Sequence, residues 1–120
     1  MAAVGSLMFI TIDCADPVAL ATFWAQVLGT EVDTAMDDGR FVFLKGGESL
    51  PVVCFQRVPE ARAGKSRIHL DLSVRDLAAA TKRVLEMGGT WPHEVERVLD
   101  GFTWRTLADP EGNEFDLALA

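Results

Sequence analysis

The residues in this sequence best suited to chemistry are His69 and Asp71. They stand two positions apart in the segment RIHLDLSV (67–74), which alternates in polarity, so their side chains share one face of a predicted strand. An imidazole held beside a carboxylate can act as a general acid or base, because the carboxylate orients the ring. The residues alone leave a second interpretation open, in which His69 is a hydrogen-bonded structural histidine and Asp71 a solvated carboxylate.

Motifs for several other chemistries are not found in the sequence. It contains no GxxxxGK[ST] loop and no strand-linked GxGxxG for nucleotide phosphates, and no GxSxG, HExxH or paired CxxC motif. Cys54 has no base placed beside it, so a nucleophilic thiol is not expected. Cys14 and Cys54 are instead predicted to be reduced, buried thiols of a cytoplasmic protein.

Composition limits the class of protein and its partners. The chain has 120 residues, of which 49% are apolar and 24% charged, as expected for one globular domain. Its net charge is −7 and it has no basic patch, which predicts no nucleic-acid partner and no docking to anionic membranes. No apolar stretch reaches the roughly 20 residues that a membrane helix needs.

The elements of the first half follow from periodicity and capping residues. Asp16-Pro17 is typical of a helix start, and apolar residues then recur at helical spacing until Gly29, which predicts a helix over 17–28 with Trp24 in the core. The preceding segment LMFITIDCA alternates and predicts a strand. Three further strands are predicted at 30–35, 40–45 and 51–58.

The second half repeats the same order after a linker at 59–66. A strand is predicted over 67–74, and a helix from its N-cap Asp76 to the Gly88-Gly89 stop. Strands are then predicted near 91–98, 102–108 and 113–119. At an offset of 60 residues Asp76 corresponds to Asp16 and Gly89 to Gly29, which predicts two βαβββ modules, at about 1–58 and 67–120, within a single domain.

Four stretches of the chain resemble the vicinal oxygen chelate superfamily, the group of glyoxalases, bleomycin resistance proteins and extradiol dioxygenases. They are IDCADPVALATFWAQVLG, FQRVPE, RIHLDLSVRDL with the following EMGG, and LADPEGNEFDL. The likeness is greatest to short glyoxalase-like domains with a His-Leu-Asp-Leu strand. The resemblance implies an α+β fold of two paired βαβββ modules, whose mixed sheets form a cup around a central cavity.

Strand alternation predicts the residues that face this cavity, because the fully apolar strand faces pack under the helices. Ligand binding is predicted for Phe9, Thr11, Asp13, Gln56, Ser73 and Glu114, with Cys54 beside them. His69 and Asp71 are the candidate catalytic residues, and Asp116 faces the same cavity. Four acids would then lie close together, which raises carboxylate pKa values.

The superfamily's metal-dependent members take one ligand from the first and one from the fourth strand of each module. The corresponding positions here are Phe9, Gln56, His69 and Asp116. His69 and Asp116 suit a divalent Zn, Ni, Mn or Fe ion, and Gln56 offers a carbonyl oxygen, whereas Phe9 has no donor atom. The resemblance therefore implies His69, Asp116 and Gln56 as candidate ligands of an incomplete site.

Aromatic residues add a second kind of lining. Phe9, Phe102 and Trp104 are able to stack on a flat ligand, but Phe102 and Trp104 share one strand face and are equally consistent with packing beneath a helix. His93 stands on a predicted strand edge without a visible partner, which favours a surface role.

Three functions stay open at this point. The first is a small-molecule binding protein like the bleomycin resistance relatives, without a complete metal site and with an acidic cavity suited to a cationic ligand. The second is a metal-dependent lyase, isomerase or dioxygenase acting on a substrate with adjacent oxygens. The third is general acid/base catalysis by His69 and Asp71 without metal. Because relatives commonly dimerise, we also expect a homodimer.

Overall fold

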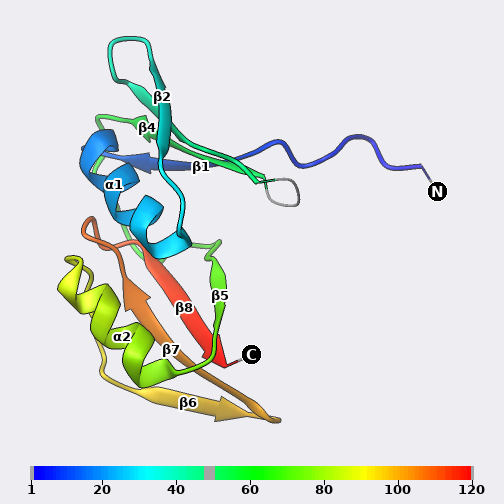
Figure 1. Ribbon diagram of the computed structural model, residues 1–120, viewed down its shortest axis with the longest axis vertical. Helices are drawn as coiled ribbons and strands as arrows, with labels where there is room; N and C mark the ends of the chain where they lie inside the picture. Colours follow the sequence, from blue (N-terminus) through cyan, green and yellow to red (C-terminus); the bar gives the residue numbers. More distant parts are fainter. Residues whose placement is uncertain (1, 48–50, 120) are drawn as a thin grey trace. The chain divides into compact units, whose positions relative to one another are not determined.

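The computed structural model describes residues 2–47 and 51–119. The chain divides into two compact units, Met1–Ala61 and Arg62–Ala120, and each is described by itself (Figure 1). The division falls within the linker predicted at 59–66. No helix among the described residues is long and apolar enough to span a membrane.

The first unit is one βαβββ module. Its elements are β1 (Phe9–Cys14), α1 (Pro17–Leu28), β2 (Val32–Met36), β3 (Phe41–Leu44) and β4 (Val52–Arg57). The strand order is β1-β4-β3-β2, with β1 parallel to β4 and the remaining pairs antiparallel. Helix α1 packs against β3 and β4, as Figure 1 shows.

Helix α1 has the bounds predicted from the sequence, because its two ends are capped by sequence-encoded devices. The Asp16 carboxylate accepts a hydrogen bond from the Ala19 N–H at 3.2 Å, and Gly29 adopts the left-handed conformation, with φ of 70°, that ends the helix. Trp24 is 2% exposed and meets Phe23 edge to face, which confirms its place in the core.

The second unit repeats the module. Its elements are β5 (Asp71–Val74), α2 (Leu77–Glu86), β6 (Glu96–Leu99), β7 (Phe102–Ala108) and β8 (Glu114–Leu119). The strand order β5-β8-β7-β6 has the same mixture of one parallel and two antiparallel pairs. The prediction of an α+β fold with two βαβββ modules is therefore confirmed.

Two predicted strands begin later than the sequence pattern indicated. The strand predicted over 67–74 begins at Asp71. In the register that pairs Asp71 with Asp116, Glu114 at the start of β8 falls opposite position 69, so residues 67 and 68 have no partner on β8. The strand predicted near 91–98 is β6, which begins at Glu96. Pro92 cannot donate to the ladder and Glu94 has φ of 50°, and these two residues interrupt the extended chain before it.

The offset of 60 residues fails at the end of the second helix. The left-handed glycine there is Gly88, with φ of 103°, and not Gly89, the position that corresponds to Gly29. Gly89 is instead packed closely, since a Cβ atom would lie 2.5 Å from Val84 Cγ1 and 2.9 Å from the Ala108 carbonyl oxygen. The two glycines therefore serve different purposes, one ending the helix and the other allowing close packing.

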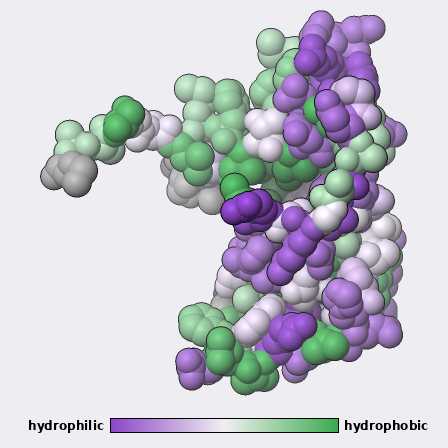
Figure 2. Space-filling model, turned by 180° about the vertical axis from the view of Figure 1, so that it is seen from behind, coloured by the Kyte–Doolittle hydropathy of each residue, from purple (hydrophilic) through white to green (hydrophobic). Residues whose placement is uncertain are grey.

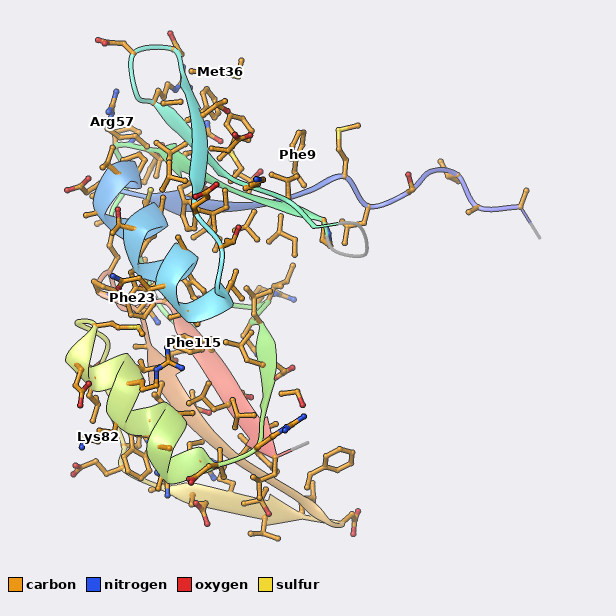
Figure 3. The ribbon with its side chains drawn as sticks, in the orientation of Figure 1. Phe9, Phe23, Met36, Arg57, Lys82 and Phe115 are labelled. Carbon is orange, nitrogen blue, oxygen red and sulfur yellow. The ribbon has the colours of Figure 1, made fainter. Side chains whose placement is uncertain are left out.

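The core of each unit lies between its helix and its sheet. Phe55 and Phe115, which are 60 residues apart, are 0% and 1% exposed, so the repeat holds in the core. Cys14 and Cys54 are buried free thiols, as predicted. On the outer side of α2, Lys82 points away from the sheet (Figure 3).

Candidate functional site

The open face of the second sheet carries a row of polar residues that the strand register brings together. We call Asp71, Asp116 and Thr106 the acid row: Asp71 on β5 pairs with Asp116 on β8, and Asp116 pairs with Thr106 on β7. Alternate residues of the same strands, such as Leu117 and Leu107, are buried. Because α2 packs against β7 and β8, the polar face lies on the other side of the sheet.

The same register gives the face an aromatic end, formed by Trp104, Phe102 and Leu99. Two residues beyond Asp116, Ala118 pairs with Trp104. Trp104 in turn pairs with Arg97 on β6, and Phe102 pairs with Leu99 next to the hairpin turn. Figure 2 shows hydrophobic side chains gathered at the lower left, over this hairpin. The face therefore changes from acidic to aromatic along the strands.

His69 stands at the acid row although it precedes β5. Its Nδ1 atom lies 3.4 Å from Asp71 Oδ1 and 3.8 Å from Asp116 Oδ2. The Thr106 hydroxyl donates a 2.6 Å hydrogen bond to Asp116 Oδ1, so the two oxygens of Asp116 face different groups. The Asp116 side chain is 14% exposed, whereas His69 and Asp71 are open to solvent.

The crowding of the acid row changes the acidity of one carboxyl group. Partial burial and the neighbouring Asp116 carboxyl raise the pKa of Asp71, while the charge of His69 opposes this effect. The neighbouring Asp116 carboxyl therefore contributes, after burial, to the raised pKa of Asp71. A cation placed in the acid row would stabilise the ionised form of this carboxyl.

A pocket of about 780 Å³ lies over this face of the second unit. The acid row and the aromatic end both line it, together with His69, Glu114 and the linker residue Lys65. Its volume is within the range of small-molecule sites, roughly 300–1,000 Å³. Glu114 at its edge pairs with Arg62 at 3.9 Å. All the described residues that line this cavity belong to the second unit.

The structure brings several predicted site residues into this pocket. His69, Asp71, Glu114 and Asp116 all line it. Ser73 lies on the same strand as Asp71 and pairs with Ala118, but it is not among the described residues that line the pocket.

The predicted site residues of the first unit lie on its own sheet. Asp13 pairs with Gln56, and Thr11 with Cys54. Burial raises the pKa of the Cys54 thiol, and its hydrogen bond to Thr11 lowers it. Phe9 stands out from β1, and its ring centroid is 5.7 Å from that of Phe43 (Figure 3). A role for these residues in ligand binding stays a prediction.

The structure decides between the two interpretations of Phe102 and Trp104 that the sequence left open. Phe102 and Trp104 line the pocket and do not pack beneath a helix, because the next residue, Arg105, is on the opposite strand face, where it donates a 3.1 Å hydrogen bond to Thr81 of α2. His93 is exposed, as expected, and also lines the pocket.

Sequence reasoning missed eight of the described residues that line the pocket: Lys65, Ser66, His93, Val95, Arg97, Leu99, Thr106 and Ala118. The spacing of Arg97 and Leu99 was a visible signal, because alternate residues of a strand share one face. Asp100-Gly101 was a second signal, since a two-residue turn of this composition fixes the pairing of the flanking strands. It places Leu99 opposite Phe102 and Arg97 opposite Trp104.

His69, Asp71 and Asp116 also form a set of potential metal ligands. One donor atom from each lies within 4.8 Å of the others. Divalent Zn binds nitrogen and oxygen ligands at about 2.0–2.2 Å, so neighbouring ligand atoms lie roughly 3–4 Å apart. The distances of 3.4 and 3.8 Å from His69 Nδ1 fit this range. The donor types and spacing therefore fit a divalent ion.

Paired βαβββ modules with a polar pocket on a mixed sheet define a protein of the vicinal oxygen chelate class. The glyoxalase-like domain family matches residues 9–118. The chain therefore belongs to the glyoxalase-like domain family. Among curated proteins, none matches the sequence significantly.

Solved structures share the fold at low sequence identity. A glyoxalase/bleomycin resistance protein/dioxygenase family enzyme from Burkholderia phytofirmans is 19% identical with a TM-score of 0.79, covering 96% of this chain and 98% of that one. A superfamily member from Sphaerobacter thermophilus is 23% identical with a TM-score of 0.72 and 98% coverage of both chains. Lactoylglutathione lyase from Agrobacterium tumefaciens is 17% identical, with a TM-score of 0.65, 96% coverage of this chain and 93% of that chain.

Proposed function

We propose that this chain is a small-molecule binding protein whose ligand occupies the pocket of the second unit. The observation that carries the proposal is one cavity of about 780 Å³ in which carboxylates, a histidine and exposed aromatic rings share a single sheet face. Apolar walls with a few polar anchors are typical of small-molecule sites. Ligand binding by Phe9, Thr11, Asp13, Gln56 and Ser73, none of which is among the described residues that line this pocket, stays a separate prediction.

The ligand is bound without the complete metal site of the superfamily. Of the four superfamily positions, Phe9 has no donor atom and Gln56 offers only an amide oxygen. The other two, His69 and Asp116, already have close protein contacts with Asp71 and Thr106. The acid row thus acts as a polar anchor made of protein groups alone.

A thermal-shift screen of metabolites and antibiotics, run with a chelator present, tests this function. Compounds that bind the folded chain raise its Tm by mass action. The shift should be lost in Trp104→Ala and retained in Val98→Ala, a control on the neighbouring strand that is 69% exposed and does not line the pocket. If no compound raises Tm at millimolar concentration, or if the shift persists in Trp104→Ala, the proposal is wrong.

A metal-dependent lyase, isomerase or dioxygenase is the second candidate. The observation that favours it is the clustering of His69, Asp71 and Asp116 donor atoms within 4.8 Å. These residues would hold a Zn, Ni, Mn or Fe ion, which when bound supplies Lewis-acid stabilisation of adjacent substrate oxygens. Thr106 would orient Asp116 through its hydroxyl.

Metal content separates the two candidates. The metal candidate predicts about one ion per chain after purification without chelator, lost in His69→Ala and Asp116→Ala and weakened in Asp71→Asn. Gln56→Ala tests whether the superfamily's amide position contributes. A chain that takes up no stoichiometric ion after supplementation with Zn, Ni, Mn or Fe would exclude this candidate.

His69 and Asp71 form the proposed catalytic pair if the bound molecule is transformed. The 3.4 Å contact holds the ring through Nδ1, so Nε2 is the atom that exchanges a proton with the ligand. His69→Ala should then abolish turnover while ligand binding persists. Loss of both together would contradict a catalytic role.

We further propose a cytoplasmic homodimer. Two buried free thiols support a reducing compartment. Light scattering at micromolar concentration should give twice the mass of the 13.1 kDa chain, and a monomer would contradict the dimer.

A further inference from the structure

We infer that the pocket of the second unit selects an organic cation with a planar apolar body, its charged nitrogen at the acid row and its ring on Trp104. The inference rests on the proposed small-molecule function and specifies the chemical class of the ligand. Three features of the pocket carry it: the position of the acids, the exposure of the aromatic end and the spacing between them.

The acid row favours positive charge. Asp71 and Asp116 are directly paired across two parallel strands, so their carboxyl groups lie side by side. The basic side chain that contacts both is His69, at 3.4 and 3.8 Å. A third acid, Glu114, follows two residues before Asp116 on the same strand and is paired with Arg62. A cationic nitrogen would be shared by the two neighbouring carboxylates.

The aromatic end favours a planar apolar group. Phe102 is 67% exposed although large apolar side chains are usually buried, and it lies next to the half-buried Trp104 in the pocket lining. Stacking of a ligand ring on Trp104 would remove apolar surface from water and add a specific aromatic contact. The exposed rings therefore have a use that burial in the core would not supply.

The space between the two ends sets the length of the ligand. Residues two positions apart on a strand are about 7 Å apart, so the acid row and Trp104 are separated by about 7 Å along β7. Ala118 occupies the row of Trp104 on the next strand, and Ser73 follows beyond it. These small side chains leave room for a short linker between the nitrogen and the ring.

Arg97, the arginine that lines the pocket, lies away from the acid row. Arg97 pairs with Trp104 on the edge strand β6, three strands from Asp71 on β5, or about 14 Å across the sheet. It therefore borders the aromatic end and leaves the two carboxylates of the acid row available. Lys65 lines the pocket from the linker. An anionic ligand would be drawn to Arg97 and Lys65 and repelled by the acid row.

Four small probes test the inference on the full chain by isothermal titration calorimetry. Phenylpropylamine carries a cation and a ring at a suitable separation, and phenylpropanol and phenylpropanoate replace the amine by a neutral and an anionic group. Benzylamine keeps the charge and the ring but is too short to reach both ends. Phenylpropylamine is expected to bind most tightly, by roughly tenfold over phenylpropanol, because a hydrogen bond to a charged group contributes more than a neutral one.

Variants show where the probe binds, and a folding check shows that any loss of binding is not caused by unfolding. Asp116→Asn and Trp104→Leu should each weaken phenylpropylamine binding roughly tenfold, while Val98→Ala and Lys82→Ala leave it unchanged. Circular dichroism melting confirms that each variant is folded, and Asp71→Asn, at an exposed side chain, replaces any variant that is not.

The probe titrations and the thermal-shift screen together distinguish failure of the cation inference from failure of the proposed binding function. Equal or tighter binding of phenylpropanol or phenylpropanoate, or no binding of any probe, overturns the cation inference. If library compounds still raise Tm and lose the shift in Trp104→Ala, the proposed binding function stands without it. If neither probes nor library compounds bind, both fail together.

Discussion

The two modules share one topology, yet their open sheet faces differ in chemistry. In the second module the central row is Asp71, Asp116 and Thr106. In the first module the strands with the same places in the sheet present Asp13, Gln56 and Phe41. One acid and the threonine are thus replaced by an amide and an aromatic ring. The fold supplies the row, and only the side chains decide whether the row is acidic.

Strand length is a second difference. Strand β7 has seven residues and begins directly after the tight Asp100-Gly101 turn, whereas its counterpart β3 has four residues. The additional length carries Phe102 and Trp104 beyond the acid row. The aromatic end of the pocket is therefore a property of the longer hairpin and has no counterpart on β3.

The largest loss of stability is expected from removing the matched aromatic residues of the two cores. Phe55→Ala and Phe115→Ala should each lower the free energy of unfolding by about 3–5 kcal/mol, because both rings are fully buried. Urea denaturation measures both losses. A loss below about 1 kcal/mol for one variant alone would show that the two cores are not equivalent.

The matched helix caps should give smaller and similar losses. Asp16→Ala and Asp76→Ala each remove a carboxylate that accepts an N–H hydrogen bond, at 3.2 and 3.0 Å. We expect each to cost about 1 kcal/mol in urea denaturation. A much larger cost for one cap would mean that this aspartate has a further role in its module.

The smallest effect is the pH dependence that comes from Asp71. Because burial and Asp116 raise the pKa of Asp71, the folded chain holds this proton more tightly than the unfolded chain. Wild-type stability should therefore fall as pH rises from the ordinary carboxyl pKa through the raised one, and this decrease should be absent in Asp71→Asn. The gain in stability from Asp71→Asn should then be larger at about pH 7 than at about pH 4.

Asp13→Asn is the matched control, since Asp13 faces the neutral Gln56. Denaturation of both variants at the two pH values checks the prediction. An equal pH-dependent gain in Asp13→Asn would show that the carboxyl pair in the second module is not its cause.

The fold could be predicted from the sequence because its signals are local. Asp16, Pro17 and Gly29 set the bounds of α1 without reference to any other part of the chain. The loss of residues 67 and 68 from β5 could not be predicted, because it depends on the register that pairs Asp71 with Asp116 and on the start of β8 at Glu114. Strand pairing is a property of two segments, and periodicity describes only one of them.

The candidate site was predicted only in part for the same reason. Alternation placed His69, Asp71 and Asp116 on one face, but the pairing of Asp71 with Asp116 depends on register. In the first module Asp13 pairs with Gln56, which is 43 residues later, whereas in the second module Asp71 pairs with Asp116, which is 45 residues later. A constant offset of 60 residues therefore makes Ser73, and not Asp71, correspond to Asp13. Because a shift of two residues keeps a side chain on the same face of its strand, the predicted residues of the second module still lie on one sheet face.

The most direct test of the account is where small molecules bind on the two modules. Backbone amide NMR spectra of the labelled full chain, recorded with compounds that raise its Tm, would locate them. The account predicts shifts confined to the pocket residues of the second unit, including Asp71, Trp104 and Asp116, with the corresponding Asp13, Gln56 and Phe41 unchanged. Shifts centred on the first sheet, or no compound-dependent shifts at all, would contradict it.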